Sequence, residues 1–139
     1  MWILDASVIV KWFFTDEPLR ENALQVQRHA VTNPKEFIIP HLCYSELLQV
    51  LARKSNNDLV FLNRSLDLIT RMGLRTFWLS NDALLKAAEF SCLGLSGYDA
   101  TYLALAHDLK GYWLTADQKA LKKNLSPHIL SLNNWRFES

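Results

Sequence analysis

The chain has 139 residues, of which 50% are hydrophobic and 21% are charged. This length fits one domain with one hydrophobic core, so residues 1–139 are expected to form a single domain, and this composition excludes a disordered chain. The formal net charge of +1 gives no global attraction to a polyanion, although a local basic rim would be enough to bind one.

Short apolar runs alternate with helical segments along the chain. The predicted strands are 2–4, 37–39, 74–79, 112–114 and 129–132. The predicted helices are 8–14, 19–32, 42–54, a segment from 56–58 to Gly73, 81–93, 98–110 and 118–123. Strands separated by helices require crossover connections. The pattern therefore predicts an α/β fold, a three-layer α/β/α sandwich around a parallel sheet of about four to five strands.

Four acidic residues fall where such a sheet would bring them together. Asp5 follows the first predicted strand, Asp117 follows strand 112–114, and Glu46 and Asp99 lie early in two helices. Ligands of open parallel sheets bind outside the carboxyl ends of the strands. Four carboxylates share a small space only if a cation offsets their repulsion, and oxygen ligands favour Mg²⁺ or Mn²⁺ over zinc. We therefore predict a metal site there, with Asp5 and Asp99 as direct ligands.

Each acid also has a purely structural interpretation. Asp5 and Asp117 are placed to cap the helices that follow them, and Ser96 with Asp99 has the spacing of a capping box. Glu46 would then lie on the solvent edge of its helix. Against this, Glu46 and Asp99 each have apolar residues one turn away, which draws both toward a buried side where an acid needs a partner.

Four segments match a known family in order and spacing: Trp2–Val8, Glu46–Leu48 after Pro40, Leu95–Ala106 and Trp113–Asp117. Through them the chain resembles the PIN-domain ribonucleases, and among these the short VapC-like toxins of prokaryotic toxin–antitoxin pairs. The resemblance implies that the four acids form the metal site and that Ser7 and Thr115 supply polar contacts beside it. It also implies a PIN-like fold, a homodimer and inhibition by a small antitoxin protein.

The chemistry of the acids agrees with this resemblance. Phosphodiester hydrolysis needs an activated water and stabilisation of charge on the phosphate, and one or two Mg²⁺ ions held by carboxylates supply both. We predict a Mg²⁺- or Mn²⁺-dependent endoribonuclease toxin that cuts RNA. The alternatives are a non-toxin PIN-domain RNA-processing nuclease and a catalytically weak scaffold that binds RNA or protein. The histidines are scattered and are interpreted as structural: His29, His41, His107 and His128.

Two other protein classes fit this sequence less well. A phosphotransferase of the haloacid-dehalogenase type needs a second aspartate two residues after the first, where this chain has Ser7. A response-regulator receiver domain needs an acceptor aspartate at the end of a central strand, and the segment 79–81, Leu-Ser-Asn, does not supply one.

Two further expectations concern partners and compartment. Cys43 and Cys92 lie in apolar helical sequence without metal-ligand spacing, so both are interpreted as buried free thiols. With no signal-peptide pattern and no apolar run near the ~18 residues that span a bilayer, we expect a cytoplasmic protein.

The aromatic residues exceed what a small core needs and point to a homodimer: Trp12, Phe13, Phe14, Phe61 and Trp78.

Overall fold

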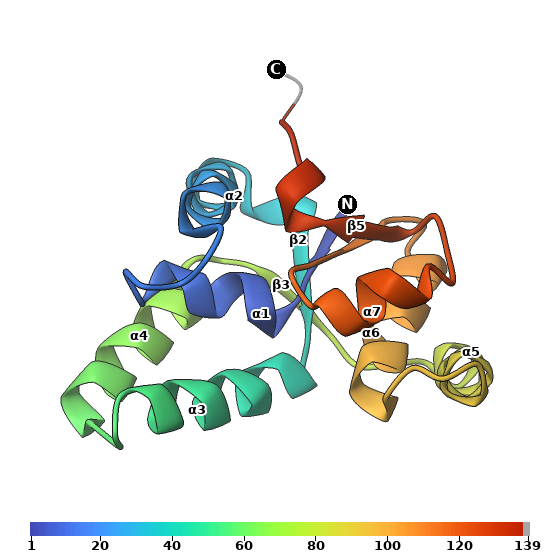
Figure 1. Cartoon of the computed structure of the whole chain (residues 1–139), viewed down its shortest axis with the longest axis horizontal. Coiled ribbons are helices and arrows are strands. Elements are labelled where there is room, and N and C mark those ends of the chain that lie inside the picture. The colour runs from blue at the N-terminus through green and yellow to red at the C-terminus, as the bar shows by residue number, and fades with distance from the viewer. Residues whose placement is uncertain (138–139) are drawn as a thin grey trace.

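The computed structural model describes residues 1–137, in which five parallel strands form one sheet (Figure 1). The strands are β1 (Trp2–Leu4), β2 (Phe37–Pro40), β3 (Arg75–Phe77), β4 (Tyr112–Thr115) and β5 (Ile129–Ser131). Their order across the sheet is β3-β2-β1-β4-β5. The chain therefore adds β2 and β3 on one side of β1, and it then returns to add β4 and β5 on the other side. Parallel sheets bind ligands at such a switch point, which here lies between β1 and β4.

Helices cover both faces of the sheet. They are α1 (Ala6–Ile9), α2 (Arg20–Thr32), α3 (Leu42–Lys54), α4 (Leu59–Arg71), α5 (Asn81–Cys92), α6 (Gly97–Asp108) and α7 (Gln118–Lys123). In Figure 1, α1 to α4 gather on one side of the sheet and α5 and α6 on the other. The predicted three-layer α/β/α sandwich with a parallel sheet is confirmed.

The core lies between the sheet and both helical layers. Ile3, Ile38 and Trp113, from three neighbouring strands, are fully buried, because a parallel sheet is covered on both faces. Helix α6 contributes a continuous buried run from Tyr102 to Ala106. The rings of Tyr102 and Trp113 stack at a centroid distance of 5.8 Å, so α6 packs directly on β4. This contact lies under the region where the site acids gather.

Two predicted elements differ from the structure. The helix expected at 8–14 is one α-helical turn, α1, followed by a 3₁₀ turn over 10–12, and it starts earlier because Asp5 caps it. Trp12 Nε1 donates to Ala23 O at 2.8 Å, which fixes the end of this segment against α2. The strand expected at 74–79 is only β3, because Ser80 already caps α5 by accepting from Ala83 N.

The aromatic residues assigned to a dimer surface are mostly part of the core. Trp12 is only 5% exposed, and Phe14 packs on Phe61 with ring centroids 5.4 Å apart. Phe13 is also packed against the core. Trp78 alone of the five is largely exposed, at 76%. The premise for the homodimer was therefore wrong for four of its five residues.

The cysteines and the membrane expectation have separate outcomes. Cys43 is buried in α3 as expected, whereas the expectation for Cys92 was wrong, because its thiol is exposed at the end of α5. Within residues 1–137, no helix combines the length and the apolar character that crossing a bilayer requires.

Candidate active site

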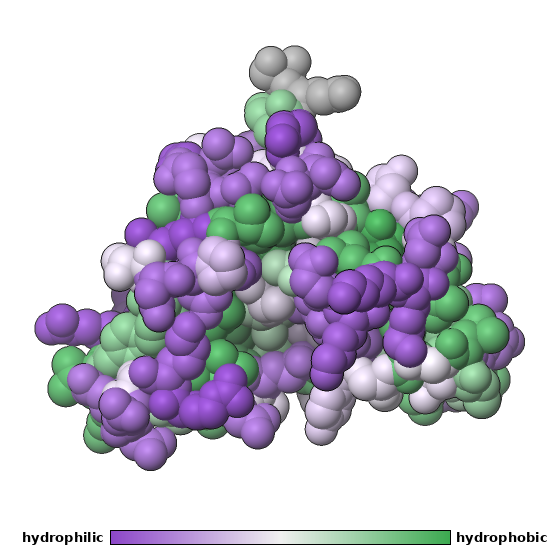
Figure 2. Space-filling view, in the orientation of Figure 1, coloured by the Kyte–Doolittle hydropathy of each residue, from purple (hydrophilic) through white to green (hydrophobic). Residues whose placement is uncertain are grey.

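The four acids line one cavity at the switch point of the sheet. Asp5 follows β1, Asp117 follows β4, Glu46 lies in the second turn of α3, and Asp99 lies in the first turn of α6. Together they line a cavity of about 380 Å³, whose remaining walls come from Ala6, Ser7, Val10 and Val50. Figure 2 shows a hollow between the lobe that carries α3 and α4 and the lobe that carries α6 and α7. The predicted convergence of the four acids is thus what the fold produces.

Two of the acids also cap helices, as the structural interpretation expected. Asp5 Oδ2 accepts from Ser7 N at 3.0 Å, and Asp117 Oδ1 accepts from Lys119 N at 2.9 Å. Ser96 Oγ accepts from Asp99 N at 3.1 Å, which starts α6. A carboxylate has about four acceptor positions, so one capping hydrogen bond leaves room for a further ligand. Capping therefore orients these acids toward the cavity and leaves acceptor positions of their carboxylates free for a further ligand.

Buried aromatic donors hold two of the carboxylates from beneath. Trp113 Nε1 donates to Asp5 Oδ1 at 3.1 Å, and Tyr102 OH donates to Glu46 Oε1 at 2.8 Å. The two rings stack on each other and are completely buried. A locked ring holds its donor in one place, so Asp5 and Glu46 have fixed positions. The sequence pattern assigned Tyr102 and Trp113 only to the core, so these positioning contacts were missed.

Ser7 and Thr115 hold the turn that carries Asp117. Ser7 Oγ accepts from Ala116 N, and Thr115 Oγ1 accepts from Asp117 N, both at 3.0 Å. The two hydroxyl oxygens lie 3.4 Å apart. They connect the start of α1 to the end of β4 and so fix the spacing between Asp5 and Asp117.

The acids raise one another's proton affinity. Burial, together with the charges of Asp5 and Asp99, raises the pKa of Glu46 to about 7, against the lowering effect of the Tyr102 hydrogen bond. Burial and the charges of Asp5 and Asp117 raise the pKa of Asp99 to about 6. Burial also raises the pKa of Asp5, although the hydrogen bonds from Ser7 and Trp113 oppose this. Burial and mutual repulsion therefore favour protonation of these carboxyls while no cation is bound, and each one that ionises adds negative charge to the cavity.

No cation of the protein offsets this charge among the described residues. The cavity lining contains no lysine, arginine or histidine. The nearby Lys11 is buried but pairs with Glu17, with 3.3 Å between its Nζ and Oε2. Every candidate ligand is a carboxylate or hydroxyl oxygen, which is the donor set of Mg²⁺ or Mn²⁺. The chemistry of the cavity fits such an ion.

The carboxylates are not drawn together around a point. Within residues 1–137, no three acidic, histidine or cysteine side chains lie close enough to hold a metal ion as they stand. Repulsion between like charges keeps unligated carboxylates apart. Binding an ion would therefore require side-chain rotations that bring the other carboxylates toward Asp5.

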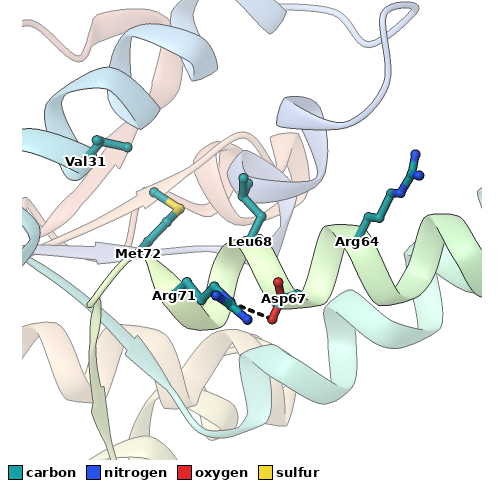
Figure 3. Close-up of a pocket in the computed structure, with 6 residues that line it drawn as sticks. All are labelled: Val31, Arg64, Asp67, Leu68, Arg71 and Met72. Carbon is teal, nitrogen blue, oxygen red and sulfur yellow. Dashed lines mark hydrogen bonds and ion pairs between the residues drawn. The ribbon is translucent and has the colours of Figure 1, made fainter.

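A second hollow lies between α2 and α4 and has different chemistry (Figure 3). Val31 enters it from α2, and Leu68 and Met72 face it from α4 and its end. Its single acid, Asp67, pairs with Arg71 at 2.9 Å. A lone, paired and exposed carboxylate cannot form a metal site, so the acidic cavity is the candidate for catalysis.

The comparisons with known proteins agree with this geometry. Residues 2–124 match the sequence model of the PIN domain. This chain belongs to the PIN domain family. No curated protein sequence matches it. The four acids of this PIN domain were predicted as its site residues, and the structure brings them to one cavity.

Solved structures share the fold of this PIN domain over most of the chain. PAE2754 from Pyrobaculum aerophilum has 18% identity and a TM-score of 0.68, over 95% of this chain and 89% of the other. A toxin–antitoxin complex from Klebsiella pneumoniae has 16% identity and a TM-score of 0.67, over 95% and 98%. Mycobacterium tuberculosis VapC20, described as a sarcin–ricin loop cleaving toxin, has 14% identity and a TM-score of 0.70, over 88% and 94%.

The raised pKa values predict that the metal-free protein loses stability as pH rises. An acid whose pKa is higher in the folded state binds its proton more tightly there, so folding is favoured while it is protonated. For Glu46 the loss starts above its ordinary pKa of 4.5 and is complete above about 7. We expect the melting temperature in EDTA to fall between about pH 5 and pH 8 in the wild type, and to fall less in Glu46→Gln.

The comparison of variants isolates this effect. His107 has a lowered pKa, owing to burial and to the charges of His128 and Lys86, and it contributes the opposite trend. Glu89→Gln is the matched control, because Glu89 is exposed on α5, pairs with Lys86 and lies outside the acidic cavity. If Glu46→Gln and Glu89→Gln melt with the same pH dependence as the wild type, folding does not raise the pKa of Glu46.

Proposed function

We propose that this PIN domain is a metal-dependent endoribonuclease whose Mg²⁺ or Mn²⁺ would be held by Asp5, Glu46, Asp99 and Asp117. One observation carries the proposal: four carboxylates from four separate segments line a single cavity that has no basic side chain. Such a cluster is costly to fold unless it binds a cation. The family supports the same chemistry, because PIN domains are nucleases.

The residues would divide the work as follows. When bound, the divalent ion supplies a charge that stabilises the phosphate and favours ionisation of the attacking water. Asp5 would be a direct ligand, held by Trp113 and Ser7, and Asp99 would complete the contact from the opposite helix layer. Glu46, oriented by Tyr102 at one oxygen, would accept a hydrogen bond from the water at the other. Asp117 would orient a second water or a second ion.

We propose a toxin role with a small antitoxin protein as partner. The support is the fold shared with a toxin–antitoxin complex and with VapC20, which is described as cleaving the sarcin–ricin loop. An arginine from the antitoxin would enter the cavity, because a guanidinium binds two carboxylate oxygens at once and would displace the metal. The protein would act in the cytoplasm, with residues 1–139 as its single nuclease domain.

We also retain the homodimer as a proposal, on a different surface from the one first expected. Three large side chains of α5 and its end are exposed: Leu84, Leu85 and Leu93. Apolar side chains that gather on one exposed element commonly mark an interface, so a second copy would pack on α5. We expect light scattering at micromolar concentration to give the mass of a dimer, and Leu85→Lys to give that of a monomer. A monomer mass for the wild type would contradict this proposal.

The first test of the nuclease is its dependence on metal and acids. We expect RNA cleavage in Mg²⁺ or Mn²⁺ and none in EDTA. Asp5→Asn and Asp99→Asn should each reduce cleavage by roughly 100-fold or more, because each removes a charged ligand of the ion. Folding should persist, since removing one charge from the cluster relieves repulsion.

Asp67→Asn is the matched control for these variants. Asp67 is an exposed acid of α4 that pairs with Arg71 and lies outside the cavity, so its loss should leave cleavage unchanged. Full activity in chelator, or full activity of a folded Asp99→Asn protein, would refute the nuclease site.

The toxin role is tested by growth. Expression of the wild-type chain in bacteria should slow growth, and expression of Asp99→Asn should not, because the variant cannot cut RNA. A small protein encoded beside the gene should restore growth when it is expressed together with the wild type. Equal growth with both chains, at equal soluble amounts, would leave an RNA-processing nuclease or a scaffold as the function.

A further inference from the structure

Trp78 is a large aromatic side chain that the fold leaves in solvent. It is 76% exposed, whereas Trp12, Trp113 and Trp135 are buried and Trp2 is half-buried. One face of its indole stacks on the imidazole of His41, with ring centroids 3.9 Å apart and 17° between the planes. The stack fixes the indole in one orientation, and its high exposure leaves the opposite face to solvent.

This stacked pair lies at the same edge of the sheet as the acids. His41 follows β2 and Trp78 follows β3, and His41 N donates to Phe77 O at 3.1 Å. Strand β3 is two places from β1 in the sheet, so Trp78 lies about 10 Å from the end of β1 along the edge. His41 also precedes α3, the helix that carries Glu46. In Figure 1, β2 runs directly into the amino-terminal end of α3.

The charge of the cavity limits how it can bind RNA. Its lining has four carboxylates and no basic side chain, so apart from the metal it repels the phosphates of the strand. Affinity for the strand must therefore come from contacts outside the cavity, and these include contacts that do not depend on phosphate charge. Stacking of unpaired bases on aromatic rings is such a contribution, and it tolerates any base because every base has a flat face.

We propose that Trp78, supported by His41, is a nucleobase platform that stacks an unpaired base of the RNA strand, one or two nucleotides from the phosphate at the metal site. The assignment of the ligand as RNA rests on the proposed nuclease function. The platform selects single strands, loops and ends, because in a duplex the flat faces of the bases are covered by their neighbours. The base would extend the existing Trp78–His41 stack by one ring.

Tryptophan fluorescence gives a direct test, because Trp78 is the most exposed of the five indoles. The titration uses the Asp99→Asn protein in EDTA, so that no RNA is cut, and oligouridylate or oligoadenylate of about six nucleotides. We expect saturable quenching by both. A duplex of the same length and a strand without bases should not quench.

Variants separate the platform from other surfaces. Trp78→Leu should weaken binding of the single strand about 5- to 150-fold, measured by anisotropy of labelled RNA, whereas Trp78→Tyr should retain most of it. Tyr112→Leu is the control, because Tyr112 is also an exposed aromatic residue but starts β4 at the opposite edge of the sheet. Its affinity for RNA should equal that of the parent.

Each result has a distinct meaning. Equal RNA affinity in the parent and Trp78→Leu would overturn the platform. So would a change from dimer to monomer in Trp78→Leu without loss of RNA affinity, since Trp78 would then belong to a protein interface.

If wild-type protein in Mg²⁺ cuts RNA and Trp78→Leu cuts it equally well at limiting RNA, the nuclease stands and the platform fails. If Trp78 binds RNA but the wild type cuts none, the platform stands and the nuclease fails.

Discussion

Electrostatic repulsion among four carboxylates at one edge of the sheet is the constraint on which the rest of the site depends. The strand order makes β1 and β4 neighbours, which brings Asp5 and Asp117 to the same cavity. Helices α3 and α6 add Glu46 and Asp99 to its lining. Residues 1–137 supply no cation to the lining of this cavity. They instead supply fixed hydrogen-bond donors, chiefly Trp113, which partly stabilise the carboxylates when no cation is bound. The unfavourable charge of the folded chain would therefore be the source of the metal affinity that we propose.

The same charge determines what else the protein must provide. A cavity that repels phosphate needs a divalent ion to bring the scissile group close, and it needs other contacts to hold the rest of a strand. The exposed Trp78 lies along the same edge and can supply contacts of that kind without added charge. The metal would then set where the strand is cut, and the aromatic platform would favour strands whose bases are unpaired.

Much of the fold and of the candidate site was predictable from the sequence, because periodicity and strand ends are local features. The alternation of apolar runs with helices indicated a parallel sheet, and Asp5 and Asp117 after two of its strands indicated where the acidic cavity lies. The donor contacts of Tyr102 and Trp113 were not predictable, because an apolar pattern shows that a ring is buried but not where its OH or N–H points. For a related reason five aromatic residues were expected at an exposed interface but only Trp78 is largely exposed, since burial of an aromatic residue depends on tertiary packing.

Binding of Mn²⁺ by the isolated protein, measured by calorimetry at neutral pH, tests the central claim most directly. The account predicts that the wild type binds Mn²⁺ and that Asp5→Asn does not. It also predicts that Trp113→Phe, which keeps a buried ring but removes the donor to Asp5, binds roughly 10-fold more weakly or worse while still folded. A wild-type chain that binds no Mn²⁺, or an Asp5→Asn chain that binds it equally well, would contradict the account.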